Sequence, residues 1–456
     1  MDSASRQHVA LIAFPFASHP GNLFAFARAL AAAAPDITFS FLTTTFAAAT
    51  LPPAPPAANL RLCHVADGVP EGGLPPGTTI HGRIGMFLRA TPGNFRDGVR
   101  AAEEEVGVKV SCVVSDAFLW MTADVAEEIG AQWLPLWTCA PAALLAHVST
   151  DQLRERFGVE KQATAGWADE LVDFIPGLSC LRIRDIPDEI VTNWHSDLSI
   201  LLHRMGNQLT SATAVALNTF DGLDTTIDAA LASLFKKTLP IGPLNLLSSP
   251  PPLQPGDEKC LSWLDGQEDA TVAYVSFGTM VLMPTQSDVS EIAQGLESSG
   301  VRFLWSLREE ARAGLLPPGF LERTAGRGLV VPWAPQVRVL GHRAVGAFVT
   351  HCGWNAVMES VTSGVPMACL PSFADQKTNA RMVSAAWGIG EALRGEKVTK
   401  EEVVRSMEIV MMGEEGRRMR ERIGNLREKA AEAVGPGGSS SENFKSVLEM
   451  VRGTAN

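Results

Sequence analysis

Two side chains that could exchange protons come soon after predicted strands. His19 follows the apolar run 8–14, and Asp116 follows the run 110–114. A neutral histidine can accept a proton near physiological pH, and a carboxylate on its other ring nitrogen fixes the tautomer and stabilises the imidazolium. If both strands belong to one sheet, the two side chains can meet. The pair is therefore a candidate general base with its partner; the structural alternatives are a core histidine and a helix N-cap.

A second group of candidate residues lies in the segment 333–376. The pattern predicts a strand at 345–350, a loop, and a helix that begins near Trp354 and stops at Gly364, a residue type common just after helix ends. The free N–H groups at the start of that helix, together with the positive end of its dipole, suit a phosphate group. Gly353 would let the backbone approach such a ligand closely. This unit therefore predicts a phosphate-binding site.

Carboxylate and amide side chains accompany this predicted phosphate site. Glu359 lies on the same helix, where its carboxylate could accept hydrogen bonds from two sugar hydroxyls, and Asp375 and Gln376 follow the next strand, 365–370. In open α/β sheets, ligands bind outside the carboxyl ends of the strands. The alternative interpretation makes Glu359 a solvated helix residue and the tryptophans of the segment core aromatics.

The elements that must position these residues repeat in two halves. The first half opens with strand 8–14 and an apolar helix at about 22–33, and the second with strand 272–277 and a helix near 287–297. Short β-rich runs then alternate with helical segments, which favours parallel sheets built from βαβ units. Further runs of this kind are 301–307 and 328–331.

The clearest break in the chain is the proline-rich stretch 243–257. Proline-rich stretches form stiff, extended spacers. We therefore expect an α/β protein with an N-terminal domain at 1–242 and a C-terminal domain at 258–456, whose last helix can pack back on the first domain. Two parallel sheets facing each other would leave a central cleft.

Charge and cysteine content exclude several classes of protein. The 456 residues include 38 basic and 50 acidic ones, so the net charge is −12, which disfavours nucleic acid and anionic membranes as partners. The seven cysteines are odd in number and contain no C-x-x-C, as expected for reduced thiols in the cytoplasm. No apolar run approaches the roughly 18 residues of a membrane span. We expect a cytoplasmic monomer that binds small molecules.

Several familiar cofactor motifs are absent from the sequence. The glycines at 388 and 390 lack the third glycine of G-x-G-x-x-G, which weakens a dehydrogenase interpretation. No P-loop, no G-x-S-x-G elbow and no zinc-ligand spacing occurs. We expect no cofactor and no metal.

The segment 333–376 resembles the nucleotide-sugar signature of the plant family 1 UDP-dependent glycosyltransferases. It shares the length of 44 residues, the W-A-P-Q opening, the H-C-G-W-N core, the E-S pair and the D-Q ending. The resemblance covers essentially the whole chain, and it is greatest to flavonoid (anthocyanidin) 3-O-glucosyltransferases. It implies the GT-B fold of two Rossmann-like domains. Further shared motifs are F-P-F-x-S-H-P at 14–20, D-G-V-P-E-G at 67–72, V-V-S-D-A-F at 113–118 and Y-V-S-F-G-T at 274–279.

The resemblance also implies a role for individual residues, with His19 as general base and Asp116 as its partner. The implied UDP-binding residues include Trp333 stacked on uracil and are Thr279, Trp333, Ala334, Gln336, His351, Gly353, Asn355 and Glu359. The implied sugar-binding residues are Ser18, Thr138, Trp354, Asp375 and Gln376. The implied acceptor-binding residues are His81, Phe118, His147 and Phe373.

Two positions depart from the family pattern. Ala356 stands where such segments usually have a serine that binds phosphate, and His81 stands where similar flavonoid enzymes have glutamine. The second departure leaves the preferred acceptor open. His81 and His147 can equally be structural histidines.

The resemblance implies an inverting transfer of glucose from UDP-glucose to a flavonoid hydroxyl, with the 3-hydroxyl as first choice. One alternative is the same machinery with another UDP-sugar or phenolic acceptor. Another is a non-catalytic protein that binds UDP-sugar or flavonoid. A nucleotide-sugar epimerase would share the fold, and it would act without an acceptor.

Overall fold

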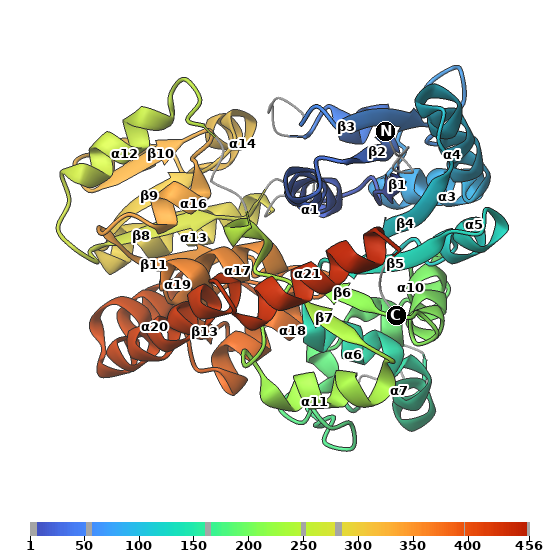
Figure 1. Ribbon diagram of the computed structural model, residues 1–456. Coiled ribbons are helices and arrows are strands. Elements are labelled where there is room, and N and C mark those ends of the chain that lie inside the picture. The colour runs from blue at the N-terminus through green and yellow to red at the C-terminus, as the bar shows by residue number, and fades with distance from the viewer. Residues whose placement is uncertain are drawn as a thin grey trace. The chain divides into compact units, whose positions relative to one another are not determined.

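The strands form two parallel sheets, one of seven strands and one of six, in this computed structural model of the protein (Figure 1). Two compact units contain them. The first unit takes in residues 1–179, 188–249 and 432–456, and the second takes in residues 180–187 and 250–431. The structure describes residues 7–51, 57–159, 166–247, 252–278, 285–395 and 397–453.

In the first unit the strand order is β3-β2-β1-β4-β5-β6-β7, and neighbouring strands are parallel. The strands are β1 (Gln7–Ile12), β2 (Ile37–Thr44), β3 (Leu60–Val65), β4 (Val110–Asp116), β5 (Gln132–Trp137), β6 (Val215–Leu217) and β7 (Thr238–Pro240). The helices are α1 (His19–Ala33), α2 (Thr45–Ala48), α3 (Ile80–Ala90), α4 (Gly93–Val106), α5 (Thr122–Glu128), α6 (Pro141–Val148), α7 (Thr150–Phe157), α9 (Asp188–Val191), α10 (Asp197–Leu209), α11 (Thr225–Leu234), η2 (Leu244–Leu246) and α21 (Ser439–Val451).

In the second unit the order is β10-β9-β8-β11-β12-β13, again parallel throughout. The strands are β8 (Val272–Ser276), β9 (Arg302–Ser306), β10 (Gly328–Val331), β11 (Val345–Thr350), β12 (Met367–Cys369) and β13 (Gly390–Ala392). The helices are η1 (Ile183–Asp185), α12 (Asp257–Asp265), α13 (Gln286–Ser299), α14 (Glu309–Leu315), α15 (Phe320–Arg323), α16 (Gln336–Leu340), α17 (Trp354–Ser363), α18 (Gln376–Arg381), η3 (Met382–Ala386), α19 (Lys400–Met407), η4 (Glu408–Met412) and α20 (Glu414–Val434), whose last residues reach the first unit.

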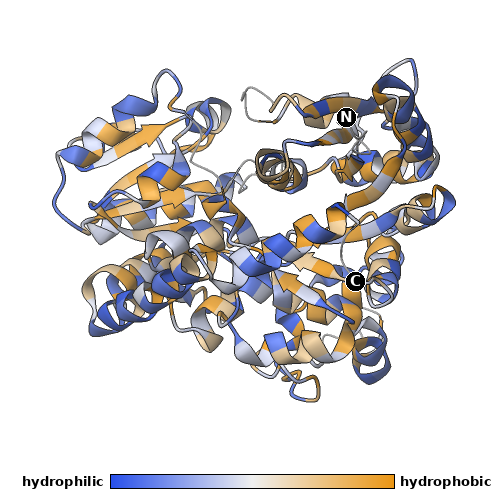
Figure 2. Ribbon diagram, in the orientation of Figure 1, coloured by the Kyte–Doolittle hydropathy of each residue, from blue (hydrophilic) through white to orange (hydrophobic). Residues whose placement is uncertain are grey.

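Both faces of the first sheet are buried, which explains why its strands are almost continuously apolar. Val9 and Leu11 of β1 belong to one core with α1 and α21, whereas Ala10 and Ile12 belong to another with α3 and α4. Successive strand side chains point to opposite faces, so a strand covered on both sides needs apolar residues at every position. Figure 2 shows this contrast between apolar strands and helices with hydrophilic outer faces.

In each sheet, the order in which the chain adds strands reverses beside the first strand of that unit. In the first unit β1 pairs with β2 on one side and β4 on the other, and in the second β8 pairs with β9 and β11. At such a switch point, the loops after the two central strands run to opposite faces and leave room for ligands. The residues after β1 and β4, and those after β8 and β11, are therefore the ones that each fold brings together.

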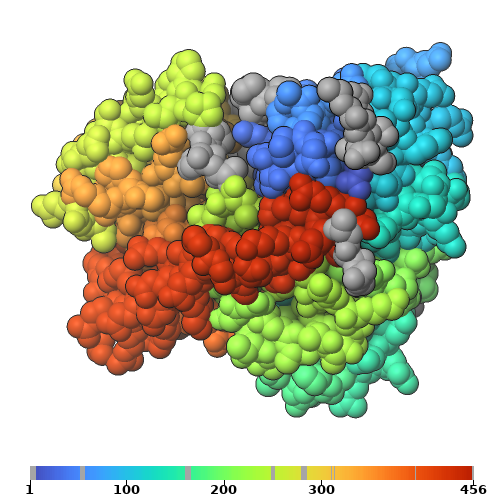
Figure 3. Space-filling model, in the orientation of Figure 1, coloured from blue at the N-terminus to red at the C-terminus, as the bar shows by residue number. Residues whose placement is uncertain are grey.

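Helix α21 closes the first unit although it lies at the far end of the chain. Its Ser440 hydroxyl donates to the Gly242 carbonyl at 2.7 Å, and the Phe444 ring lies 6.0 Å from that of Phe26 on α1. Figure 3 shows the red C-terminal residues against the blue residues of α1. The sequence analysis allowed for this packing.

The sequence did not predict that a short segment from the middle of the first unit would belong to the second unit. Residues 180–187 belong to the second unit, where the Asp185 carbonyl accepts from the Thr378 hydroxyl at 2.6 Å. The main change of unit, between 249 and 250, falls inside the proline-rich stretch 243–257, of which 248–251 lie outside the described residues.

The predicted strands occur, with small errors at their ends. The predicted run 365–370 is strand only over Met367–Cys369. His19 is the first residue of α1 rather than a loop residue, and Asp116 is the last residue of β4 rather than a residue beyond it. Among the described residues, no helix is both long enough and apolar enough to cross a membrane.

Candidate functional site

His19 and Asp116 meet at the switch point of the first sheet. Nδ1 of His19 lies 2.7 Å from Oδ2 of Asp116, and the two residues are 7% and 1% exposed. The other oxygen, Oδ1, accepts from the Phe118 backbone N–H at 3.0 Å. Because an ionised carboxylate only accepts hydrogen bonds, Nδ1 must carry the proton, and Nε2 keeps its lone pair. The arrangement can therefore accept a proton at Nε2.

Thr138 and two aromatic rings lie against this imidazole, and a third ring packs behind one of them. The Thr138 hydroxyl lies 3.2 Å from His19 Nδ1. The ring centroids of Phe118 and Phe14 lie 4.5 Å and 5.3 Å from that of His19, and Trp137 packs behind Phe118 at 5.7 Å. These rings shield the imidazole from water and would present an apolar surface to a ligand.

The remaining predicted residues of the first unit are less closely connected. Ser18 is exposed, and His81 is exposed on α3. His147 on α6 is buried, its ring 6.2 Å from that of Trp137, and burial lowers its pKa to about 4. Ring contacts connect His147 to His19 through Trp137 and Phe118.

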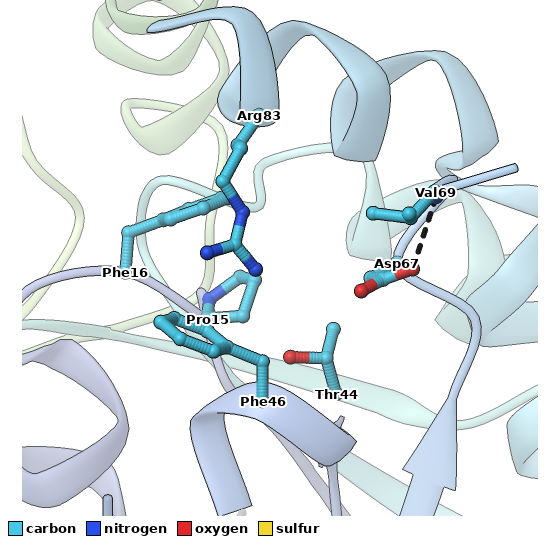
Figure 4. A pocket seen from close by; sticks show the side chains of 7 residues that line it. All are labelled: Pro15, Phe16, Thr44, Phe46, Asp67, Val69 and Arg83. Carbon is cyan, nitrogen blue, oxygen red and sulfur yellow. Dashed lines mark hydrogen bonds between the residues drawn. The ribbon is translucent and has the colours of Figure 1, made fainter. Parts of the chain in front are cut away.

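A recess that the sequence did not predict lies at the carboxyl edge of β1, β2 and β3 (Figure 4). The Arg83 guanidinium stacks over the Phe46 ring at 3.9 Å, and Asp67 Oδ1 accepts from the Val69 N–H at 3.0 Å. Phe16 connects the recess to the rings around His19, since its centroid is 5.2 Å from that of Phe14. The lining residues are Pro15, Phe16, Thr44, Phe46, Asp67, Val69 and Arg83.

In the second unit, two glycines pack tightly against the ring of His351, one in the loop after β11 and one in the loop after β8. A Cβ added to Gly353 would lie 2.6 Å from His351 Nε2, and one added to Gly278 would lie 3.0 Å from Cε1, so larger residues would displace the ring. Burial lowers the pKa of His351 to about 4, and its Nδ1 is buried with no hydrogen-bond partner among the described residues. His351 is thus a neutral imidazole beside the N-terminus of α17.

A chain of three side chains runs from β8 to α17. The Tyr274 hydroxyl donates to Gln336 Oε1 at 3.3 Å, and Gln336 Nε2 donates to Glu359 Oε2 at 2.6 Å. Burial raises the pKa of Glu359 to about 7, although the bond from Gln336 opposes the shift. Tyr274 is the only tyrosine of the chain, and sequence reasoning gave it no role.

The segment 333–376 also presents an exposed aromatic ring, that of Trp333. Trp333 is 57% exposed, an unusual state for a tryptophan. Ala334 beside it is buried, and Trp354 is buried with its ring centroid 6.3 Å from that of Trp387. Asn355 is half-buried and Ala356 is buried, while Thr279 lies outside the described residues.

The loop after β12 is held by the side chain of Gln376, the last residue of the segment 333–376. Gln376 is 4% exposed, and its Oε1 accepts from the backbone N–H groups of Ser372 at 2.9 Å and Phe373 at 3.2 Å. The carbonyl is therefore used within the protein, and the amide NH2 is the group left to meet a ligand. Phe373 and Asp375 are half-buried.

Three of these loops contain a non-glycine residue in the left-handed region. The φ angles are 57° at Ala17, 62° at Cys352 and 53° at Ala374. Residues with side chains rarely adopt such angles, which cost about 1–3 kcal/mol and concentrate at functional sites. Each residue lies one or two positions before His19, Gly353 or Gln376. No local sequence signal marked them.

Metal ligands do not gather in this part of the protein. Within the described ranges, no three His, Cys, Asp or Glu side chains are grouped so that they could hold a metal ion.

Comparisons with known proteins agree with the fold. The family model described as "UDP-glucoronosyl and UDP-glucosyl transferase" matches residues 91–426. The "Anthocyanidin 3-O-glucosyltransferase UFGT" of Vitis vinifera is 46% identical over 453 residues, covering 98% of each chain. The "Anthocyanidin 3-O-galactosyltransferase F3GT1" of Actinidia chinensis var. chinensis is 43% identical, covering 99% of this chain and 98% of that protein.

A solved structure shows the same architecture. It is described as a UDP-glucose: anthocyanidin 3-O-glucosyltransferase in complex with UDP, with a TM-score of 0.91 and 35% identity, covering 98% of this chain and 99% of that one. With two all-parallel sheets in the present structure, this confirms the predicted α/β fold of the GT-B class with two Rossmann-like domains.

Proposed function

Because the chain belongs to the family of UDP-glucoronosyl and UDP-glucosyl transferases, we propose that it transfers glucose from UDP-glucose to the 3-hydroxyl of a flavonoid, with inversion at the anomeric carbon. The observation that carries the proposal is the 2.7 Å contact between His19 and Asp116, since a protein that only bound the ligands would not need a buried acid–base pair. The 46% identity to an anthocyanidin 3-O-glucosyltransferase supports the substrate class.

In this proposal the first unit binds and activates the acceptor. His19 Nε2 takes the proton of the attacking hydroxyl, and Asp116 stabilises the imidazolium. Phe118, His147 and His81 are assigned to the acceptor, as is Phe373. Thr138 and Ser18 are assigned to the sugar, although Thr138 also meets Nδ1 of His19.

The second unit holds the donor. Trp333 stacks on uracil next to the Ala334 backbone. Gln336 and Glu359 hold the ribose hydroxyls, and the Glu359 carboxylate accepts hydrogen bonds from them. The leaving diphosphate gathers charge, which the N-terminus of α17 and the His351 imidazole can stabilise. Further residues assigned to the donor are Thr279, Gly353, Trp354, Asn355, Asp375 and Gln376.

We expect activity without a metal ion. The proposed diphosphate site consists of backbone N–H groups and neutral side chains, whereas Mg²⁺ is usually held by carboxylates together with phosphate. Initial rates of glucose transfer should therefore be unchanged in excess EDTA. Loss of activity in EDTA that Mg²⁺ restores would contradict this part of the proposal.

The affinity for UDP should depend on the protonation of Glu359. Its pKa is about 7 in the free protein, and ribose hydroxyls bind a carboxylate better than a carboxylic acid. If only the carboxylate binds, protonation would weaken binding by up to about 30-fold at pH 5.5. Calorimetric titration with UDP should show this loss in the wild type and not in Glu359→Gln, where protonation of UDP itself is the same. Identical pH profiles would rule out the role of Glu359.

Gln376 should favour UDP-glucose over UDP-galactose by at least about tenfold in kcat/KM, because an unmade bond to a buried polar group costs about 1–3 kcal/mol. The relatives include both glucosyl- and galactosyltransferases, so similarity does not decide the sugar. Gln376→Glu keeps an oxygen for the Ser372 and Phe373 N–H groups and removes the amide donor. It should shrink the ratio, as should Gln376→Ala. Equal use of both sugars by the wild type would widen the proposed activity.

The experiment that tests the function is mass spectrometry of products from a panel of UDP-sugars and flavonoids. A flavonol or anthocyanidin monoglucoside is the expected product. Another glycoside would keep the mechanism and change the substrates, whereas binding without turnover would favour a sensor. A blank without acceptor detects an epimerase. We also propose that the protein is cytoplasmic, which the absence of disulfides among the described cysteines supports, and that it is a monomer.

A further inference from the structure

Asn379 on α18 connects two loops of the second unit. It is 0% exposed, and its Nδ2 donates to the Cys352 carbonyl at 2.8 Å and to Asp375 Oδ2 at 3.1 Å. The first contact lies in the loop before α17, and the second lies at the N-cap of α18. A single amide group therefore binds both the loop assigned to the diphosphate and the residue assigned to the sugar.

The orientation of this amide is fixed by chemistry. Both of its partners are oxygens that can only accept, so the nitrogen must face them and Oδ1 must face away. Oδ1 is buried with no hydrogen-bond partner among the described residues. Buried polar atoms almost always find partners, so an unpartnered one points to a constraint that outweighs its cost. Here the constraint is the simultaneous hold on Cys352 and Asp375.

Both loops need such a hold because their backbones are strained. Cys352 has φ 62°, and Ala374, beside Asp375, has φ 53°. Each loop has a second restraint, since the Cys352 N–H donates to Thr350 Oγ1 at 3.2 Å and Gln376 Oε1 accepts from the Ser372 N–H at 2.9 Å. Neither of those two bonds connects one loop to the other, whereas Asn379 bonds to both.

We infer that Asn379 is a positioning residue for glucose transfer: it locks Asp375, and with it the sugar end of the donor, in register with the diphosphate loop. The inference rests on the proposed function, because the loops receive their roles there. A displacement of about 1 Å at a positioning group can cost about 100-fold in rate. Binding of the nucleotide alone depends less on Asp375.

The test compares Asn379→Asp, which is nearly isosteric and lacks both donors, with Asn379→Ala. In assays with UDP-glucose and quercetin, kcat should fall about 10- to 100-fold, whereas the Kd for UDP should change by less than about threefold. In an Asp375→Ala background, the Asn379 changes should lower kcat by no more than about twofold further. Unchanged kcat, or full additivity with Asp375→Ala, would overturn the inference.

A matched control separates positioning from general destabilisation. Thr324→Val removes another buried hydrogen bond of the same unit, 2.8 Å to the Phe320 carbonyl, far along the chain from these loops. If it lowers kcat as much as Asn379→Asp at an equal drop in Tm, Asn379 is merely structural. If the wild type fails to transfer glucose, the proposed function fails first. The inference then still predicts that Asn379→Asp lowers the affinity for UDP-glucose relative to the affinity for UDP. An unchanged ratio of the two affinities would overturn it.

Discussion

Replacing His19 by alanine is expected to lower kcat for glucose transfer by about 10²–10⁴-fold, the usual contribution of a general base. The variant lacks Nε2, the ring nitrogen that keeps its lone pair while Asp116 holds Nδ1 at 2.7 Å. UDP affinity should change little, because the residues assigned to UDP belong to the other unit. Initial rates with UDP-glucose and a flavonol, together with calorimetric titration of UDP, measure the two effects separately.

His203→Ala is a suitable control, because His203 also pairs with a carboxylate, Asp151 at 2.7 Å, on a more exposed surface. It should retain wild-type turnover. Near-normal turnover of His19→Ala would remove this histidine from the mechanism. A parallel loss of UDP binding would indicate a damaged fold instead.

Asp116→Asn is expected to be nearly as damaging, at about 10²–10⁴-fold in kcat. The Phe118 N–H donates to Oδ1, so the asparagine oxygen must occupy that position. Its NH2 group then faces His19 Nδ1 and donates to it. The ring must carry its proton on Nε2, where the base is needed, and no negative charge remains to stabilise an imidazolium.

Steady-state kinetics across pH 6–9 test this tautomer argument. Asp116→Ala leaves the tautomer free, so it should retain at least as much activity as Asp116→Asn if it folds. Full activity of Asp116→Asn would refute the dyad even if the His19 prediction held. Equal melting temperatures of wild type and Asp116→Asn would show that the loss is chemical.

The strands at the centres of the sheets could be predicted well because burial on both faces demands uninterrupted apolar runs. The predicted strand 345–350, which lies inside its sheet, agrees with the structure at both ends. The predicted strand 328–331 also agrees at both ends, although β10 lies at the edge of its sheet. The ends of β12 and the start of α1 could not be predicted, since they depend on where backbone groups find partners. Nor could the transfer of 180–187 to the second unit, which rests on contacts such as that between Asp185 and Thr378.

The residues of the candidate site also differ in how far the sequence predicts them. His19 and Asp116 could be proposed as neighbours because one follows β1 and the other ends β4, the two strands at the switch point. Asn379 and Tyr274 could not be found, because each acts through a side chain that only the fold brings near. The use of the Gln376 carbonyl has a different cause, since it depends on the local conformation of the loop whose backbone N–H groups it accepts from.

The most direct test of the central claim is proton NMR of the first product formed by the wild type from UDP-glucose and a flavonol. UDP-glucose has the α configuration, so a single displacement with His19 as base predicts the β-glucoside, attached at O3. An α-glucoside, or no glucoside while UDP still binds, would contradict the account.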